Sequence, residues 1–540
     1  MKMPKLHLLP LLVCTLLCAS SSIAAPRPPA IIPQPAQMTV QADASGYTLT
    51  PETAIVVVDN AFAREANFAA TELRRSTGLP LPVVTTGEGG IRFERSAAPL
   101  PLEGYTLSVT ETAVVIGASD PAGAFYGYQT IRQLLPPQVY AKTVQANVAW
   151  EMPACTITDV PRLKWRGVMV DDVRHFIGGD GIRQMIDVMA AHKMNNLHWH
   201  LTDDQGWRIE IRKYPEILEK GAIRDNSAKP RDRWRPDGKP YGPYYYTQAE
   251  VRAIVAYAAE RHINIVPEIE MPGHALALLA SHPELSCTGG PFKPRWLWGV
   301  EPDILCAGND AVFPFMKDIL DEIMLLFPSK YIHLGGDEAP KDRWNVCEKC
   351  QARIKEKGLR NSFHLQTWFI QQFADYLEAN DRHLIGWDEI LEGGLPAGAA
   401  VMSWRGMKGG IAAAMMGHNV VMAPNDFCYL DYGQGIENDP YEYNIANVPL
   451  RKVYTMNPTA GIPEQMHSYI IGVQGNLWSE YIWDAADQQW KAWPRAAAIA
   501  EIGWTPQEKR DWPTFAKAME TNFERLRILG INAAPADLTP

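Results

Sequence analysis

From Leu163 onward, short apolar segments of strand type alternate with helical stretches. That alternation is typical of a parallel sheet in which each strand is followed by a helix. Eight strands is the number that closes a (β/α)8 barrel, so we predict an α/β fold with this barrel over residues 156–505. The expected strands are 166–170, 195–202, 262–269, 331–335, 383–386, 400–403, 419–423 and 470–476, with helices between most of them, for example at 181–192, 311–326 and 363–379.

Two further segments flank the predicted barrel. Residues 26–155 are expected to form a small α+β support domain, and residues 506–540 a C-terminal helix packed on the barrel. In the first segment, strands are predicted at 54–58, 105–109 and 113–116 and helices at 62–75 and 123–135. Beyond the eighth strand, helices are predicted at 488–502, which should complete the barrel, and at 512–529.

Residues 1–25 have the pattern of a signal peptide. Lys2 and Lys5 supply the positive end, and a short apolar run follows. Ser22-Ile23-Ala24 and Ile23-Ala24-Ala25 both fit a small-residue cleavage site. We therefore expect export, to the periplasm or the medium. No later apolar run reaches the roughly 18 residues needed to cross a bilayer, so no membrane span is expected after removal of the signal.

The charge and the cysteines limit the possible partners. The formal net charge of −10 disfavours a nucleic acid partner. Disulfides are permitted in an exported protein, and Cys287 and Cys306 bracket one loop, so we predict that they pair. Cys347 and Cys350 form a single CxxC. Zinc would require two more ligands at suitable spacing, and no second CxxC exists, so a metal is the less favoured interpretation.

Polar and aromatic residues follow every predicted barrel strand. In such a barrel the active site is built at the carboxyl ends of the strands. Acids can move protons, aromatic rings can stack on sugars, and an arginine can bind hydroxyl groups, so the set predicts a sugar site. In strand order the residues are Asp171, Asp172 and Arg174; Asp203 and Asp204; Glu268, Glu270 and His274; Asp337 and Glu338; Trp387, Asp388 and Glu389; Trp404 and Arg405; Tyr429 and Asp431; Trp478 and Glu480.

The acid pair after the fourth strand has two interpretations. Asp337 could simply cap a helix, with Glu338 in its first turn, or Glu338 could be the general acid of a glycosidase. Asp337 suits the nucleophile role poorly, because neighbours in an extended chain point to opposite sides. Some glycosidases use the substrate itself as nucleophile. A rival chemistry is a metal-dependent hydrolase built on His198 and His200, which share one face of their strand.

Seven motifs in order along the chain resemble those of glycoside hydrolase family 20, the β-N-acetylhexosaminidases. The resemblance extends from about residue 30 to about residue 505 and includes the small N-terminal α/β domain usual in that family. The motifs are RHF (174–176), HWHLTDDQGW (198–207), EMPGH (270–274), HLGGDE (333–338), GWD (386–388), SW (403–404) and LWSE (477–480).

The resemblance implies a retaining, substrate-assisted mechanism without a cofactor or a metal. The acetamido oxygen of the substrate would attack its own anomeric carbon and give an oxazolinium. Glu338 would protonate the leaving oxygen and then deprotonate water, while Asp337 would bind the acetamido N–H and stabilise the developing charge. Tyr429 would donate to the acetamido oxygen, and His274 and Asp203 would form a relay behind Glu338. We expect burial and the Asp337 charge to raise the pKa of Glu338.

The same resemblance assigns the substrate-binding residues. Trp387, Trp404 and Trp478 would enclose the acetyl group, and Arg174 would bind the hydroxyls on C3 and C4. Asp431 and Glu480 would bind those on C4 and C6. The expected partner is an oligosaccharide with a terminal, non-reducing, β-linked GlcNAc or GalNAc. The rival functions are a disaccharide-releasing enzyme of the same fold, a non-catalytic sugar-binding protein and the metal-dependent hydrolase.

Overall fold

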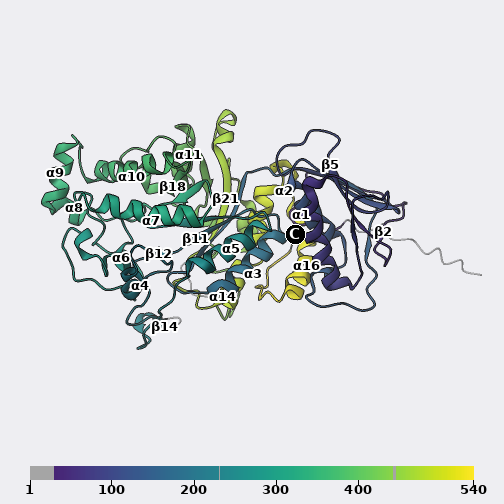
Figure 1. Ribbon diagram of the computed structural model, residues 1–540, viewed down its shortest axis with the longest axis horizontal. Helices are drawn as coiled ribbons and strands as arrows, with labels where there is room; N and C mark the ends of the chain where they lie inside the picture. The colour runs from purple at the N-terminus through teal and green to yellow at the C-terminus, as the bar shows by residue number, and fades with distance from the viewer. Residues whose placement is uncertain (1–28, 230–231, 442–445, 540) are drawn as a thin grey trace, which may run out of the picture.

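The chain folds into a closed barrel preceded by a smaller domain (Figure 1). The computed structural model describes residues 29–229, 232–441 and 446–539, so the predicted signal peptide lies outside the described residues. Eight parallel strands close the barrel in chain order, which confirms the predicted α/β architecture. They are β10 (Trp165–Asp171), β11 (Asn196–His200), β16 (Asn264–Glu268), β17 (Tyr331–His333), β18 (His383–Trp387), β19 (Ala400–Ser403), β20 (Val420–Met422) and β21 (Ile470–Leu477).

The barrel closes where β21 pairs with β10, with Trp165 opposite Gly472 and Val170 opposite Leu477. Every residue of these two strands is buried, because the barrel interior covers one face and helices cover the other. The helices between and after the strands are α3 (Gly178–Ala191), α4 (Glu216–Gly221), α5 (Gln248–Ala259), α6 (Leu276–Leu279), α7 (Val312–Leu326), α8 (Asp342–Val346), α9 (Glu348–Glu356), α10 (Ser362–Glu378), α11 (Lys408–Met415), α12 (Asn425–Cys428) and α13 (Leu450–Thr455). Two short hairpins, β12 (Thr202–Asp203) with β13 (Gly206–Trp207) and β14 (Ala228–Lys229) with β15 (Asp232–Pro236), project from the loop after β11.

The predicted helix at 488–502 is two helices, α14 (Ala485–Ala492) and α15 (Arg495–Trp504). The break is at Trp493, whose backbone is extended, with φ −107° and ψ 135°. Pro494 explains it, because the proline ring disfavours a helical conformation in the preceding residue and supplies no N–H to a helix.

The N-terminal domain is a seven-stranded mixed sheet covered by two helices, α1 (Ala63–Thr77) and α2 (Pro121–Leu134). The predicted hairpin is present as the antiparallel pair β6 and β7. The last strand, β9, extends to Asp159, four residues past the expected boundary at 155. In sheet order the strands are β1 (Gln37–Val40), β9 (Cys155–Asp159), β6 (Tyr105–Val109), β7 (Ala113–Ala118), β5 (Gly90–Arg95), β3 (Ile55–Val57) and β4 (Val83–Val84).

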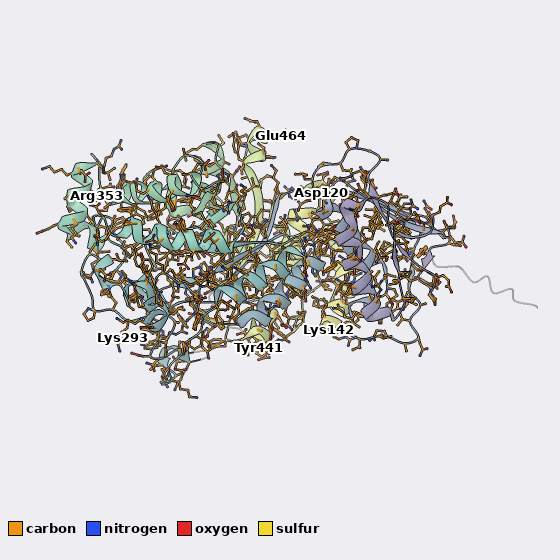
Figure 2. All side chains as sticks on the ribbon, in the orientation of Figure 1. Asp120, Lys142, Lys293, Arg353, Tyr441 and Glu464 are labelled. Atoms are coloured by element: carbon orange, nitrogen blue, oxygen red, sulfur yellow. The ribbon has the colours of Figure 1, made fainter. Side chains whose placement is uncertain are left out.

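Buried polar contacts join this domain to the barrel. The guanidinium of Arg166, on β10, donates to both carboxylate oxygens of Glu103, each at 3.0 Å. Lys193 lies 3.0 Å from Asp159 in a fully buried ion pair. The C-terminal helix α16 (Trp512–Leu529) has the predicted bounds and lies between the two units (Figure 1). Side chains fill the space on both sides of it (Figure 2).

The predicted Cys287–Cys306 disulfide is wrong, because all six cysteines from Cys155 onward are free thiols. The fold instead brings Cys347 and Cys350 to the same place, and the Cys287 sulfur lies 3.7 Å from that of Cys350. Among the described residues, no helix is long and apolar enough to cross a membrane.

Candidate active site

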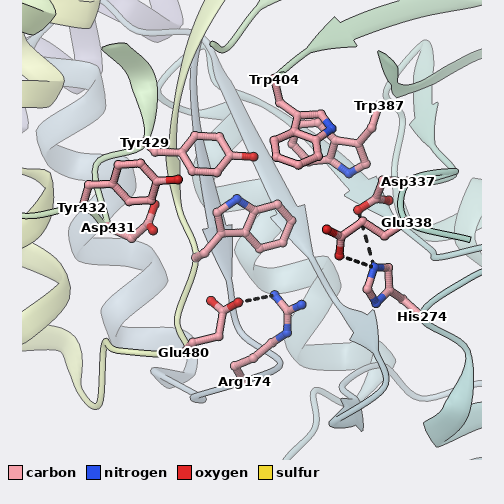
Figure 3. Close-up of a pocket in the computed structure, with 11 residues that line it drawn as sticks. Arg174, His274, Asp337, Glu338, Trp387, Trp404, Tyr429, Asp431, Tyr432 and Glu480 are labelled. Carbon is pink, nitrogen blue, oxygen red and sulfur yellow. Dashed lines mark ion pairs between the residues drawn. The ribbon is translucent and has the colours of Figure 1, made fainter. Parts of the chain in front are cut away.

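One pocket opens at the carboxyl ends of the barrel strands (Figure 3). It encloses about 620 Å³ including its mouth, a size ordinary for small-molecule sites. Ten of the eleven predicted site residues line it, and Asp203 lies behind it. Tyr432 is the added member, three residues after Tyr429. The lining residues are Arg174, His274, Asp337, Glu338, Trp387, Trp404, Tyr429, Asp431, Tyr432, Trp478 and Glu480.

The backbone that carries the acid pair is not an extended strand. β17 ends at His333, and positive φ angles follow at Gly335 (64°), Gly336 (90°) and Glu338 (44°). A Cβ on Gly335 would lie 1.7 Å from a carboxylate oxygen of Glu270, so only glycine fits there. The chain therefore turns sharply before it reaches Asp337.

This turn corrects the expectation that Asp337 and Glu338 point apart. A carboxylate oxygen of each lies 3.6 Å from the same atom, Nε2 of His274 (Figure 3). The two acids differ in exposure instead: the side chain of Asp337 is 10% exposed, whereas that of Glu338 is 42% exposed. Asp337 Oδ1 is buried and has no hydrogen-bond partner in the described part of the chain. Asp337 therefore offers a free acceptor inside the pocket, and Glu338 lies nearer to solvent.

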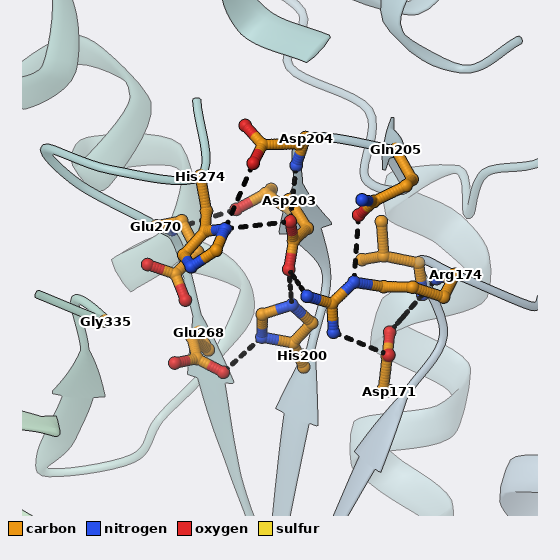
Figure 4. A network of polar contacts seen from close by, with 12 residues as sticks. Asp171, Arg174, His200, Asp203, Asp204, Gln205, Glu268, Glu270, His274 and Gly335 are labelled. Atoms are coloured by element: carbon orange, nitrogen blue, oxygen red, sulfur yellow. Dashed lines mark hydrogen bonds and ion pairs between the residues drawn. The ribbon is translucent and has the colours of Figure 1, made fainter. Parts of the chain in front are cut away.

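A buried network lies behind His274 (Figure 4). Its Nδ1 is 3.2 Å from Asp203 and 3.1 Å from Asp204. Both acids come from the segment after β11, where the β12–β13 hairpin places them. The structure thus places His274 between the Glu338 carboxylate and the Asp203 carboxylate, the arrangement that a proton relay requires.

The network continues into the barrel through alternating charges. Asp203 is 2.6 Å from Arg174 and 3.0 Å from His200, and His200 also contacts Glu268. Glu268 is contacted in addition by His198, at 3.2 Å, and by His333, at 2.8 Å. The two imidazoles that suggested a metal-dependent hydrolase thus both contact the buried Glu268 carboxylate, and neither lines the pocket.

The network sets the pKa values of the acids. Burial lowers the pKa of His274, but the Asp203 charge and the contacts with Asp203, Asp204 and Glu338 outweigh burial and raise it well above 6.5. The hydrogen bond to His274 then lowers the pKa of Glu338, against the effect of burial. The expected rise for Glu338 is therefore wrong for the empty pocket, because His274 supplies a cation at its carboxylate. Burial raises the pKa of Asp337 to about 6.

Aromatic rings form one end of the pocket (Figure 3). Trp387 and Trp478 are 5.6 Å apart between ring centroids, and Trp404 stacks nearly parallel to Tyr429 at 6.0 Å. Buried carboxylates fix two of the rings. The indole N–H of Trp387 donates to the Glu268 carboxylate at 2.8 Å. The indole N–H of Trp404 donates to the Glu389 carboxylate at 2.9 Å.

The opposite end carries charged side chains. The guanidinium carbon of Arg174 lies 5.1 Å from the centroid of the Trp478 ring. Its Nη1 atom lies 3.8 Å from a carboxylate oxygen of Glu480. Gln205 accepts from Arg174 Nε at 2.9 Å and fixes its orientation. Asp431 is buried, its Oδ1 has no hydrogen-bond partner among the described residues, and burial together with the Glu480 charge raises its pKa to about 8. This end therefore offers one cation and two acids to a polar ligand.

The sequence singled out Asp204, Glu268 and Glu389 as residues that follow strands, but gave them no role. Their function is to orient other residues, and that depends on side-chain contacts between strands. Tyr432 was missed altogether. The only signal for it in the sequence is a second tyrosine three residues after Tyr429.

Comparison with known proteins accounts for this geometry. Residues 163–507 match the model described as glycosyl hydrolase family 20, catalytic domain, and residues 28–160 match domain 2 of the same family. The chain belongs to glycosyl hydrolase family 20. The resemblance in its sequence motifs is thereby confirmed, and the support domain is the second domain of the family.

Individual family 20 proteins align over most of this chain. A beta-hexosaminidase of Porphyromonas gingivalis is 43% identical over 511 residues, which is 93% of this chain and 64% of the relative's own length. The chain thus spans just under two thirds of that relative. The structure of the beta-N-acetylhexosaminidase from Streptomyces coelicolor A3(2) is similar with a TM-score of 0.82 at 32% identity, covering 95% of this chain and 98% of that one. The structure of a mutant Streptomyces plicatus beta-hexosaminidase in complex with product, GlcNAc, is similar with the same TM-score of 0.82 at 32% identity. The match covers 96% of this chain and 99% of that one.

Proposed function

We propose that this family 20 protein is an exo-acting β-N-acetylhexosaminidase. It removes terminal, non-reducing, β-linked GlcNAc or GalNAc from oligosaccharides with retention of configuration, through an oxazolinium formed by the substrate. The observation that carries the proposal is the buried, unpartnered Asp337 Oδ1 beside an aromatic box that also presents the Tyr429 hydroxyl. The GlcNAc bound to the Streptomyces plicatus relative supports the choice of sugar.

An acetamido group is complementary to this box at each of its three parts. Its N–H donates to Asp337 Oδ1, its carbonyl oxygen accepts from Tyr429, and its methyl group contacts the faces of Trp387 and Trp404. Held in this way, the carbonyl oxygen attacks the anomeric carbon as the glycosidic bond breaks. The negative charge of Asp337 stabilises the positive charge of the oxazolinium that forms. This interaction is stronger in a buried site than in water, because little solvent screens the two charges.

Glu338 supplies the proton to the leaving oxygen. In the empty pocket its pKa is low, because His274 is protonated beside it. A sugar bound at the mouth covers its exposed face and removes water, which raises the pKa of the carboxyl. After the leaving group departs, Glu338 takes a proton from water, whose oxygen attacks the anomeric carbon and reopens the oxazolinium. Asp203 keeps His274 charged and oriented throughout.

The far end of the pocket supports release of single sugars. Arg174, Asp431 and Glu480 line this end of the pocket. In the proposed function they bind the hydroxyls on C3, C4 and C6 of the terminal sugar and leave no room for a further sugar. Buried acceptors such as Asp431 Oδ1 are left unpaired by any substrate lacking the matching hydroxyl, and this makes the end selective.

Chromogenic glycosides test the proposal directly. The enzyme should hydrolyse β-GlcNAc and β-GalNAc aryl glycosides and leave the β-glucoside intact, and a thiazoline mimic of the oxazolinium should inhibit it competitively. Chitotetraose should yield GlcNAc as the first product. Equal rates on the β-glucoside would overturn the substrate-assisted mechanism.

Two other results would select a rival function. If a disaccharide were the first product, the protein would be the disaccharide-releasing enzyme of the same fold. Tight thiazoline binding without hydrolysis of any glycoside would show a sugar-binding protein.

A further inference from the structure

Four cysteines that are far apart in the sequence converge at one point outside the pocket. Their sulfur atoms all lie within 4.8 Å of one another. The Sγ of Cys306 is 3.6 Å from that of Cys350 and 3.8 Å from that of Cys347, and Cys287 is 3.7 Å from Cys350. Cys306 and Cys350 are fully buried, and the other two are half-buried.

These spacings are those of a metal site. Zinc binds thiolate sulfur at about 2.3 Å in a tetrahedron, whose edges are then about 3.8 Å. A disulfide would bring one pair to about 2.05 Å and separate it from the other sulfurs. Here the three separations given above lie between 3.6 and 3.8 Å, and none of the three is near a disulfide length.

We propose that Cys287, Cys306, Cys347 and Cys350 bind one structural zinc ion. Four thiolates complete the coordination shell, so no position remains for water or substrate and the ion has no catalytic role. The single CxxC supplies only two of the four ligands. The fold brings the other two, Cys287 and Cys306, from the segment between β16 and α7. The CxxC itself lies at the start of α9, with Cys347 as the N-cap residue.

The surroundings of the four sulfurs are shaped around them. A Cβ at Gly308 would lie 2.2 Å from the backbone carbon of Lys349, so the two loops meet there without room for a side chain.

Further contacts preorganise the same junction without a metal. Arg343 donates two hydrogen bonds to the Asp303 carboxylate, at 3.0 and 2.9 Å. The indole N–H of Trp344 donates to the carbonyl of Leu305 at 2.9 Å. The ligands are thus held at metal-binding spacing by the loops that carry them.

The proposed ion joins the two loops that carry the acid–base pair. Leu305, next to Cys306, donates to the carbonyl of Pro272, two residues before His274. Cys347 follows Glu338 by nine residues on the loop after β17. Helices α8 and α9 lie at the end of the barrel away from the N-terminal domain, where Arg353 marks α9 (Figures 1 and 2). The ion therefore fixes the separation of the two loops from outside the pocket.

Metal and thiol content of the full chain test this proposal. The protein should be prepared twice, once exported through its leader and once expressed in the cytoplasm without it. Elemental analysis should find one zinc per chain in both. After denaturation with a chelator and without a reductant, both should show six reactive thiols from the cysteines after residue 150.

A matched pair of variants separates the site from thiols in general. Cys347→Ser/Cys350→Ser should retain less than a tenth of the zinc, while Cys155→Ala, which removes a buried thiol of β9, should retain all of it. Two reactive thiols and no zinc in the exported protein would overturn the proposal in favour of two disulfides. Six thiols without stoichiometric metal would also overturn it, and one iron per chain would overturn the assignment to zinc. None of these outcomes depends on the glycosidase activity.

Discussion

Replacing Asp337 by asparagine should stabilise the protein while it removes the activity. The pKa of this carboxyl rises from 3.8 to about 6 on folding, chiefly because the group is buried. Since a tenfold change in proton affinity corresponds to about 1.36 kcal/mol, ionised Asp337 costs the folded state about 3 kcal/mol. Asparagine has nearly the same shape and carries no charge, so Asp337→Asn avoids this cost.

The gain has a defined pH dependence. Well below pH 3.8 the carboxyl is neutral in both the folded and the unfolded chain, and the variant gains nothing. Between pH 4 and 6 only the unfolded chain ionises, so the wild type loses stability as the pH rises. Above about pH 6 both states are ionised and the full difference persists. With an unfolding entropy of about 2.1 cal/mol/K per residue over roughly 500 residues, 3 kcal/mol corresponds to about 3 °C.

Differential scanning calorimetry of Asp337→Asn and wild type at pH 4, 6 and 8 measures the effect. The variant should unfold about 3 °C higher at pH 8 and at the same temperature at pH 4, with most of the hydrolysis of β-GlcNAc lost. Asp180→Asn, at a fully exposed carboxyl on α3, is the control and should show no such trend. A variant that unfolds at or below the wild-type temperature at pH 8 would refute the reasoning that the pocket holds a costly charge.

The other predictions concern the reaction. Glu338→Gln should lower kcat on chitobiose by about 10²–10⁴, but much less on aryl glycosides whose leaving groups need no proton; equal losses would remove Glu338 as the acid. Trp404→Ala should reduce the preference for the N-acetylated sugar over the non-acetylated one, as measured by kcat/KM, and unchanged discrimination would count against the acetyl box. Asp203→Asn should lower the pKa of His274, because the Asp203 charge is the largest effect that raises it. NMR titration of the His274 imidazole measures this pKa, and an unchanged value would contradict the relay.

The barrel could be predicted because its strands are buried on both faces. Runs such as those in β19 and β21 are mostly apolar, are buried throughout and are separated by helices, and few other folds have that pattern. The helix at 488–502 was predicted wrongly for a visible reason, since Pro494 was in the sequence and its effect on Trp493 is local. Most of the pocket residues follow strands, so counting strands was sufficient to place them together.

Contacts between loops could not be predicted in the same way. Cys287 and Cys306 were paired because they bracket one loop, but the partners of both come from a loop 40 residues further on. The Glu270 side chain packs against the turn at Gly335. The alternation of residues along a strand cannot predict such a contact between two segments. The pKa of Glu338 depends on His274, whose distance from it is set by two loops.

His274 and Glu338 are both in a backbone conformation that non-glycine residues rarely adopt. The φ angle is 48° at His274 and 44° at Glu338, and each such residue costs about 1–3 kcal/mol. Strain of this kind persists only where neighbouring structure fixes the chain on both sides. Asp203 and Asp204 fix the imidazole of His274, and the proposed zinc joins its loop to that of Glu338. The positions of His274 and Glu338 thus depend on buried charges beneath the pocket and, through the proposed ion, on four sulfurs beside it.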